Sequence, residues 1–194
     1  EVGRAPEVRR WFRFEDTPKE ELSPAAWKER FQDLFRGCVE DRLPSHGPVG
    51  IFLSGGLDSS LVTAEIAGMV DRPVKTWALH FGEHYPNELE FAREVADYCG
   101  TEHREVEVSP QGFLERMKKI IWVLDDPIGD PITVPNYELS QEVRSEVGSI
   151  FNGEGGDPCF GGPKNLGMMM EHWYGGIERP TDFRERAYLR SYRR

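Results

Sequence analysis

One short stretch of the chain combines a strand, a tight turn and the start of a helix: Val49-Gly50-Ile51-Phe52-Leu53-Ser54-Gly55-Gly56-Leu57-Asp58-Ser59-Ser60. The apolar residues predict a buried strand, and the paired glycines allow the backbone to approach a bulky anion closely. Free N–H groups at the start of the following helix, together with its dipole, favour that anion. The serines add hydroxyl donors, and Asp58 adds a carboxylate suited to Mg²⁺. The stretch therefore predicts a pyrophosphate cradle, with ATP and Mg²⁺ as its expected ligands.

A simpler interpretation of the same residues has to be weighed. Gly-Gly after a strand commonly marks only a tight turn, and Ser or Asp before a helix is commonly only a cap. The full string behind a β-branched run is much rarer than Ser-Gly-Gly alone. It also differs from the Walker loop and from the Gly-rich turn of dinucleotide-binding folds, so neither of those sites is predicted.

Strand-like and helix-like segments alternate along the chain, which predicts an α/β fold with a mostly parallel sheet flanked by helices. The expected strands are 49–53, 74–81, 105–108 and 149–151. Helices are expected at 24–43, 87–99 and 136–147. A further helix follows the glycine turn and has Leu57, Leu61, Val62, Ile66 and Met69 on its apolar side, and another begins at Ser109-Pro110. Because ligands bind beyond the carboxyl ends of such strands, the loops 54–60, 81–87 and 152–162 are the candidate site.

Bulk composition narrows the classes of partner. A net charge of −10 argues against a nucleic-acid surface, which needs basic patches. No apolar run approaches the ~20 residues that span a bilayer, which argues against a membrane segment. Cys38, Cys99 and Cys159 fit neither a disulfide framework nor a zinc motif, so a reduced, cytoplasmic setting is expected.

A second glycine-rich stretch follows the last expected strand: Asn152-Gly153-Glu154-Gly155-Gly156-Asp157-Pro158-Cys159-Phe160-Gly161-Gly162. Five glycines in eleven residues are costly in conformational entropy, which a packed fold tolerates where the backbone wraps a ligand. Asp157 can join Asp58 in binding Mg²⁺, and Glu154 can act as an acid or base or position the acceptor substrate. The alternative is an exposed loop with no ligand.

The two motifs together resemble a known family. Residues 54–60 resemble the PP-loop of the ATP pyrophosphatases. Residues 152–162 resemble the S-G-E-G-x-D-E-x-F-G-G of the asparagine synthetase C-terminal domain, and residues 124–131 resemble its L-D-E-P-x-x-D-P. The resemblance covers most of residues 45–165. It implies an adenine nucleotide α-hydrolase-like fold and an ATP-dependent ligase that converts aspartate to asparagine through an aspartyl-adenylate, with release of AMP and pyrophosphate.

The resemblance also implies roles for single residues. Mg²⁺ would be held by Asp58 and Asp157, and Glu154 and Asp157 would be catalytic, with Glu154 beside the reacting carboxylate. The residues implied to contact the nucleotide are Phe52, Ser54, Gly55, Gly56, Leu57, Asp58, Ser59, Ser60, Leu79, Asn152 and Gly153.

The chain departs from the family pattern at several positions. Asn152 stands where the family usually has Ser, Pro158 replaces the usual Glu, and residues 163–165 replace an aromatic residue. Lys164 either supplies charge near the phosphates or is solvated, and the family's later catalytic lysine has no recognisable match. Two alternatives therefore stay open: a β-lactam synthetase-like or other amide ligase with a different acceptor, and a non-catalytic nucleotide-binding module.

Three regions are expected along the chain. Residues 1–44 form an arm and helix that follow a missing N-terminal domain, 45–165 form the PP-loop synthetase core, and 166–194 begin a truncated helical C-terminal part. Because the chain starts with Glu1 rather than Met, it is expected to be a fragment whose parent has a glutaminase domain that supplies ammonia. Aromatic residues near the C-terminus predict contacts with missing parts or with a second copy in a homodimer.

Overall fold

The computed structural model describes residues 9–12, 20–126 and 130–160, and the chain divides into units of residues 1–38 and 39–194. The first unit holds most of α1 (Pro24–Glu40). Ser23 caps this helix as predicted, since the Ala26 N–H donates to its Oγ at 3.2 Å. The helix ends three residues before the predicted Leu43, because turn-type bonds replace the helical ones there.

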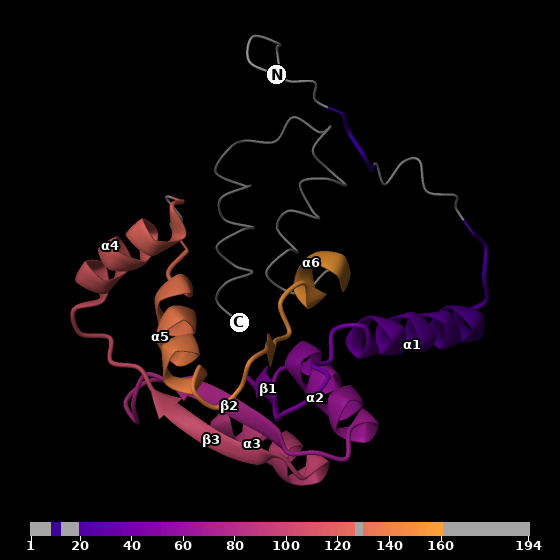
Figure 1. The fold of residues 1–194 in the computed structure, drawn as a ribbon, viewed down its shortest axis with the longest axis horizontal. Coiled ribbons are helices and arrows are strands. Elements are labelled where there is room, and N and C mark those ends of the chain that lie inside the picture. Colours follow the sequence, from indigo (N-terminus) through magenta and orange to yellow (C-terminus); the bar gives the residue numbers. More distant parts are fainter. Residues whose placement is uncertain (1–8, 13–19, 127–129, 161–194) are drawn as a thin grey trace, which may run out of the picture. The chain divides into compact units, whose positions relative to one another are not determined.

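The second unit is built on a four-stranded parallel sheet in the order β3-β2-β1-β4. The strands are β1 (Val49–Phe52), β2 (Val74–His80), β3 (Glu102–Glu107) and β4 (Ile150–Phe151). Figure 1 labels the first three, and β4 pairs with β1. The predicted α/β fold with a parallel sheet is confirmed. Because all four strands run the same way, their carboxyl ends meet at one edge.

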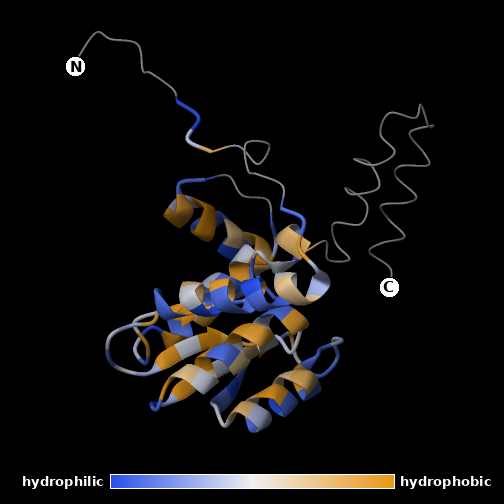
Figure 2. Ribbon diagram, turned by 90° about the vertical axis from the view of Figure 1, so that its right-hand side faces the viewer, coloured by the Kyte–Doolittle hydropathy of each residue, from blue (hydrophilic) through white to orange (hydrophobic). Residues whose placement is uncertain are grey.

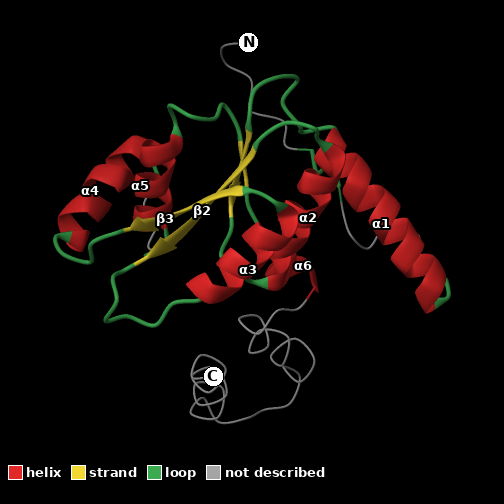
Figure 3. Ribbon diagram, turned by 90° about the horizontal axis from the view of Figure 1, so that it is seen from below, coloured by secondary structure: helices red, strands yellow, loops and turns green. Residues whose placement is uncertain are grey.

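Helices cover both faces of this sheet. Figure 3 shows the yellow strands between α2 (Leu57–Met69) and α3 (Leu89–Cys99) on one side and α4 (Phe113–Leu124) and α5 (Thr133–Val143) on the other. A short helix, α6 (Gly156–Phe160), follows β4. Orange and blue residues alternate along the helices in Figure 2, as expected of helices with one buried side.

Side chains alternate between the two faces along β1 and β2. Leu53 and Ala78 belong to a buried cluster with residues of α3. Phe52 and Leu79 instead pack against a cluster that contains Trp77 of β2 and Leu139 of α5. The side chains at the ends of β1 and β2 thus build two separate halves of the core, one under each helical layer.

Two sequence predictions about these elements were wrong. The third strand begins at Glu102 rather than at residue 105. Its residues are mostly charged, but it pairs with β2 from Lys75 to His80. The buried side of α2 carries Ser59 and Thr63 besides the correctly predicted Ile66, whereas Leu57 and Leu61 are 83% and 41% exposed. The first turn of α2 faces a cavity rather than the core, and polarity is tolerated there because hydrogen bonds satisfy the hydroxyls.

Other element ends differ by a few residues. α5 runs from Thr133 to Val143 rather than from 136 to 147, and α6 lies inside the stretch predicted to be a loop. α3 ends as predicted at Gly100, whose φ of 66° is left-handed. Within the described residues, no helix has both the length and the apolar character needed to cross a membrane.

A cluster of charges ties the α5 side of the sheet together. Glu146 accepts from Lys75 Nζ at 2.9 Å and also pairs with Arg104. These two hydrogen bonds, the one from Lys75 first, hold the pKa of Glu146 below its ordinary value. The Arg104 guanidinium also lies 5.6 Å from the centre of the Trp77 ring, a cation–π distance. The cluster thereby links β2, β3 and the segment that follows α5.

Substituting Gly50 by alanine is expected to destabilise the second unit by about 1–3 kcal/mol, the usual cost of overpacking. A Cβ there would lie 2.5 Å from Ile150 Cδ1 and 2.8 Å from Val147 Cγ2, which would push β1 and β4 apart. Gly68→Ala in α2 is the matched control, since no atom lies within 4 Å of its Cβ position and alanine favours the helix. Denaturant unfolding would measure both, and equal effects would contradict this prediction.

Candidate active site

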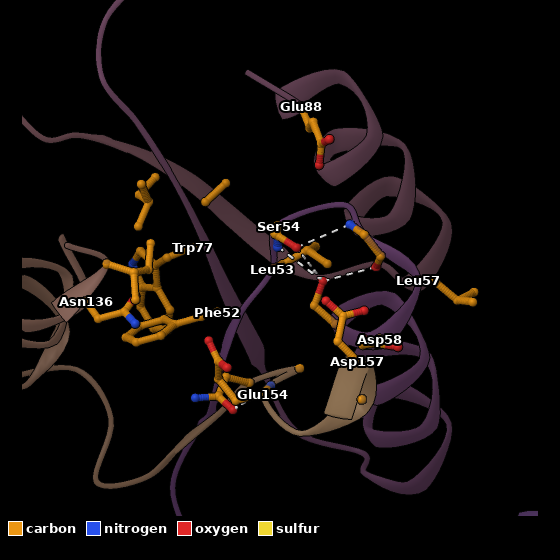
Figure 4. A pocket seen from close by; sticks show the side chains of 18 of the residues that line it. Phe52, Leu53, Ser54, Leu57, Asp58, Trp77, Glu88, Asn136, Glu154 and Asp157 are labelled. Carbon is orange, nitrogen blue, oxygen red and sulfur yellow. Dashed lines mark hydrogen bonds between the residues drawn. The ribbon is translucent and has the colours of Figure 1, made fainter. Parts of the chain in front are cut away.

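A cavity of about 760 Å³ opens at the carboxyl ends of β1 and β2, within the second unit. Figure 4 shows its wall, to which the turn before α2, the start of α3, α5 and the segment around α6 contribute. The lining residues with polar side chains are Ser54, Asp58, Ser59, His80, Asn87, Glu88, Asn136, Asn152, Glu154 and Asp157. Four segments that are distant in the sequence thus meet in one site.

The turn after β1 is held by its own serine hydroxyls. Ser54 Oγ and Ser59 Oγ lie 3.0 Å apart, and Ser59 Oγ also accepts from the Ser54 N–H and donates to the Gly56 carbonyl. The Gly56 N–H donates to Ser54 Oγ at 3.2 Å. Gly55 has a φ of 85° and lies against α3, where a Cβ would be 2.7 Å from the Ala92 nitrogen. Only glycine fits this turn without strain.

The start of α2 faces the cavity without a side-chain cap. Gly56 is the N-cap residue, and among the described residues the first turn has no side-chain cap hydrogen bond. Leu57, Asp58 and Ser59 of this turn all line the cavity. Uncapped N–H groups and the positive end of a thirteen-residue helix make this position suitable for an anion such as a phosphate.

The second glycine-rich stretch packs directly on that turn. A Cβ on Gly153 would lie 2.7 Å from the Ser59 nitrogen, and a Cβ on Gly156 would lie 2.2 Å from the Asp58 carboxyl carbon. Within this stretch, Asn152 Oδ1 accepts a hydrogen bond from the Glu154 N–H at 3.1 Å, which helps to fix the conformation of the loop. Gly153 is needed because a side chain there would overlap the backbone of the first turn of α2, whereas a side chain at Gly156 would displace the Asp58 carboxylate. The contact between the two loops brings Glu154 and Asp157 to the same cavity as Asp58 (Figure 4).

The charged groups of the cavity wall are acidic. Asp58, Glu88, Glu154 and Asp157 line it, and no Lys or Arg does so among the residues that the structure describes. Within those residues no group of three or more His, Cys, Asp or Glu side chains forms a metal site by itself. Two carboxylates do suit Mg²⁺ that arrives with a nucleotide, because this ion is usually held by one or two carboxylates plus substrate phosphates. Asp58 and Asp157 fit that pattern.

The other end of the cavity is apolar and lies against α5. Phe52, Trp77 and Leu79 reach it from the sheet, and Leu139 closes it from the helix. Asn136, in the first turns of α5, adds an amide to this wall. Trp77, Glu88 and Asn136 were not predicted as site residues. No local sequence pattern marks them, because only the fold places α3 and α5 beside the strand ends.

Most of the predicted site residues are brought together by this cavity. Gly55 and Ser60 are outside its lining, since Gly55 packs on α3 and Ser60 Oγ donates to the Gly56 carbonyl at 2.7 Å. Lys164 lies outside the described residues. The predicted residues that line the cavity are Phe52, Ser54, Gly56, Leu57, Asp58, Ser59, Leu79, Asn152, Gly153, Glu154 and Asp157.

Among solved structures, the chain is similar to a predicted subunit of tRNA methyltransferase from Methanocaldococcus jannaschii, with 22% identity and a TM-score of 0.39 over 56% of this chain and 53% of that one. It is also similar to an NH3-dependent NAD synthetase from Campylobacter jejuni, with 16% identity and a TM-score of 0.36 over 64% of this chain and 51% of that one.

The chain also matches curated relatives and a family model. The chain is 34% identical over 131 residues to asparagine synthetase [glutamine-hydrolyzing] 1 of Bacillus subtilis, which covers 68% of this chain and 21% of that protein. It is 36% identical over 135 residues to a putative asparagine synthetase of Methanocaldococcus jannaschii, covering 69% and 26%. The chain thus spans about a fifth to a quarter of these relatives. The model of the family described as asparagine synthase matches residues 30–191, and the chain therefore belongs to the asparagine synthase family.

Proposed function

We propose that the chain carries the ATP-binding synthetase region of an amide-forming ligase, with aspartate as the acceptor and asparagine as the product. One observation carries this proposal. The glycines of the second loop pack on the turn before α2, so that Glu154 and Asp157 share a cavity with the uncapped helix start. This arrangement supports a phosphate site beside an acidic acceptor site, as activation of a carboxylate by ATP requires.

The phosphate end of the cavity supports binding of the nucleotide. Backbone N–H groups of Leu57, Asp58 and Ser59 would face the phosphates, and the bonded hydroxyls of Ser54 and Ser59 keep that turn in shape. Asp58 and Asp157 would hold Mg²⁺, which neutralises phosphate charge when bound. The acidic wall supports this need for a divalent cation, because carboxylates alone would repel a polyphosphate.

The proposed reaction has two steps. A carboxylate oxygen of aspartate attacks the α-phosphorus of ATP, the bond to the β-phosphate oxygen breaks, and pyrophosphate leaves. Ammonia then attacks the acyl carbon of the aspartyl-adenylate, AMP leaves with the bonding electrons, and a proton is lost from nitrogen to give asparagine. Glu154 would position the acceptor, and the backbone donors would stabilise charge that develops on phosphorus oxygens.

The ammonia source and partners belong to the same proposal. The relatives are named as glutamine-hydrolysing enzymes, which supports an N-terminal glutaminase domain as the source of ammonia in the full-length protein. Contacts with a second copy, in a homodimer, and a cytoplasmic setting remain predictions from the sequence.

Pyrophosphate release from Mg-ATP is the direct test. With ammonia supplied, we expect release from the full-length protein to be stimulated by aspartate within a panel of amino acids, and to give one AMP per pyrophosphate. Stimulation by another carboxylate alone would favour an amide ligase with a different acceptor. ATP binding without release for any acceptor would contradict the ligase and favour a non-catalytic nucleotide-binding module.

A further inference from the structure

We propose that the side-chain amide of Asn136 recognises adenine through its 6-amino group and a neighbouring ring nitrogen. Asn136 would then be a specificity-determining residue that favours ATP over triphosphates without that amino group. This inference rests on the proposed nucleotide-binding function, and it concerns the apolar end of the cavity rather than the phosphate end.

The backbone of Asn136 is engaged by its helix, whereas its side chain is not. The Asn136 N–H donates to the Ile132 carbonyl at 3.1 Å, and its carbonyl accepts from Ser140 Oγ at 2.7 Å. The side-chain amide makes no hydrogen bond to any residue in the part of the chain that the structure describes. The residue is half-buried and lines the cavity, and Figure 4 shows its side chain extending toward Phe52 and Trp77.

The surroundings of this amide suit the flat face of a base. Phe52 and Leu79 are half-buried and give the wall its apolar surface, backed by Trp77 and Leu139, which are each 1% exposed. The indole Nε1 of Trp77 is buried and has no hydrogen-bond partner among the described residues. The flat faces of a planar ligand are favoured here because the wall is apolar, but polar atoms at the edge of the ligand need a hydrogen-bond partner. The Asn136 amide is placed to be that partner.

The spacing from the phosphate end is consistent with one nucleotide. Phe52 precedes Ser54 by two residues, which corresponds to about 7 Å along an extended chain. Phosphates at the start of α2 and a base beside Phe52 would leave a ribose between them. The base would then lie between the end of β1 and the first turns of α5, where Asn136 is found.

An amide has the hydrogen-bonding pattern that adenine requires. Its oxygen accepts and its nitrogen donates, in one plane and side by side. Adenine carries an amino donor at position 6 with a ring-nitrogen acceptor next to it on either side, so both bonds can form at once. A purine without the amino group retains only the acceptor, and the amide oxygen then loses its donor.

The experiment compares the binding of three ligands to the wild-type chain and to two variants, by calorimetry with Mg²⁺. ATP is compared with the triphosphate of purine riboside, which lacks the 6-amino group, and inorganic triphosphate reports the phosphate end alone. The wild type is expected to bind ATP about tenfold more tightly than the purine riboside triphosphate. Asn136→Leu, which keeps the size of the side chain, should bind both nucleotides with equal affinity.

Controls separate this role from a structural one. Inorganic triphosphate should bind wild type and Asn136→Leu equally, and Asn136→Gln, which keeps an amide, should restore part of the preference for ATP. An unchanged ratio between the two nucleotides in Asn136→Leu would overturn the role of Asn136 and leave the proposed ATP site standing. Failure of the wild-type chain to bind ATP would overturn both proposals.

Discussion

Substituting Asp58 by asparagine is expected to lower pyrophosphate release from Mg-ATP by about 100-fold or more, the usual range for losing a group that stabilises transition-state charge. Asparagine keeps the shape that packs against Gly156 but removes the negative charge. The proposed Mg²⁺ site would then retain only Asp157. Because the acidic wall offers no Lys or Arg among its described residues, the phosphates would lose part of their charge compensation.

The measurement is the initial rate of pyrophosphate release over a range of Mg²⁺ concentrations. Asp71→Asn is the matched control, because Asp71 is an exposed acid at the far end of α2 and outside the cavity lining. It should leave rate and Mg²⁺ dependence unchanged. Thermal unfolding of both variants shows whether the chain still folds. A folded Asp58→Asn chain with the wild-type Mg²⁺ dependence would refute the role of Asp58 in metal binding.

Substituting Gly153 by alanine is expected to weaken ATP binding by about tenfold or more and to destabilise the fold by about 1–3 kcal/mol, or roughly 2–12 °C in Tm for a chain of this size. The added Cβ would lie 2.7 Å from the Ser59 nitrogen and 3.1 Å from the Asp58 carbonyl carbon. Both are backbone atoms, so a side-chain rotation cannot relieve the overlap. The two loops must separate, and the phosphate turn loses its neighbour.

Gly148→Ala provides the comparison for this second variant. Gly148 is close to Gly153 in sequence, has no atom within 4 Å of its Cβ position and does not have a positive φ. Alanine there should be neutral in both Tm and ATP affinity, as measured by thermal unfolding and calorimetry. If Gly153→Ala matched it in both, the packing of the two loops would be irrelevant to binding.

The features that could be predicted from the sequence are those determined by residues that are adjacent in the chain. The strand and turn at 49–56 were identified because apolar residues end in glycines, and the end of α3 because Gly100 takes the left-handed conformation. The two loops of the site were identified because their glycines and acids are contiguous. In the structure, Gly153 and Gly156 are the positions where this loop packs on the start of α2. The sequence alone indicated only that the backbone there wraps a ligand.

What the sequence could not predict depends on contacts between distant segments. The strand that begins at Glu102 is mostly charged, and its first three residues form a strand only because they pair with β2. Leu57 reads as an apolar helix residue, yet it is exposed because the first turn of α2 opens on the cavity. Trp77, Glu88 and Asn136 lie in ordinary strand and helix patterns. Their presence at the site follows from the sheet order and from which face each helix covers.

The serine bonds that close the turn after β1 have a kinetic consequence. Ser54 Oγ and Ser59 Oγ are 3.0 Å apart, and Gly56 donates through its N–H to Ser54 Oγ and accepts through its carbonyl from Ser59 Oγ. The turn is therefore organised on folding, and little ordering entropy remains to be lost when a ligand arrives. We expect nucleotide association to proceed at a rate limited by encounter rather than by loop closure, with affinity differences among variants expressed mainly in dissociation.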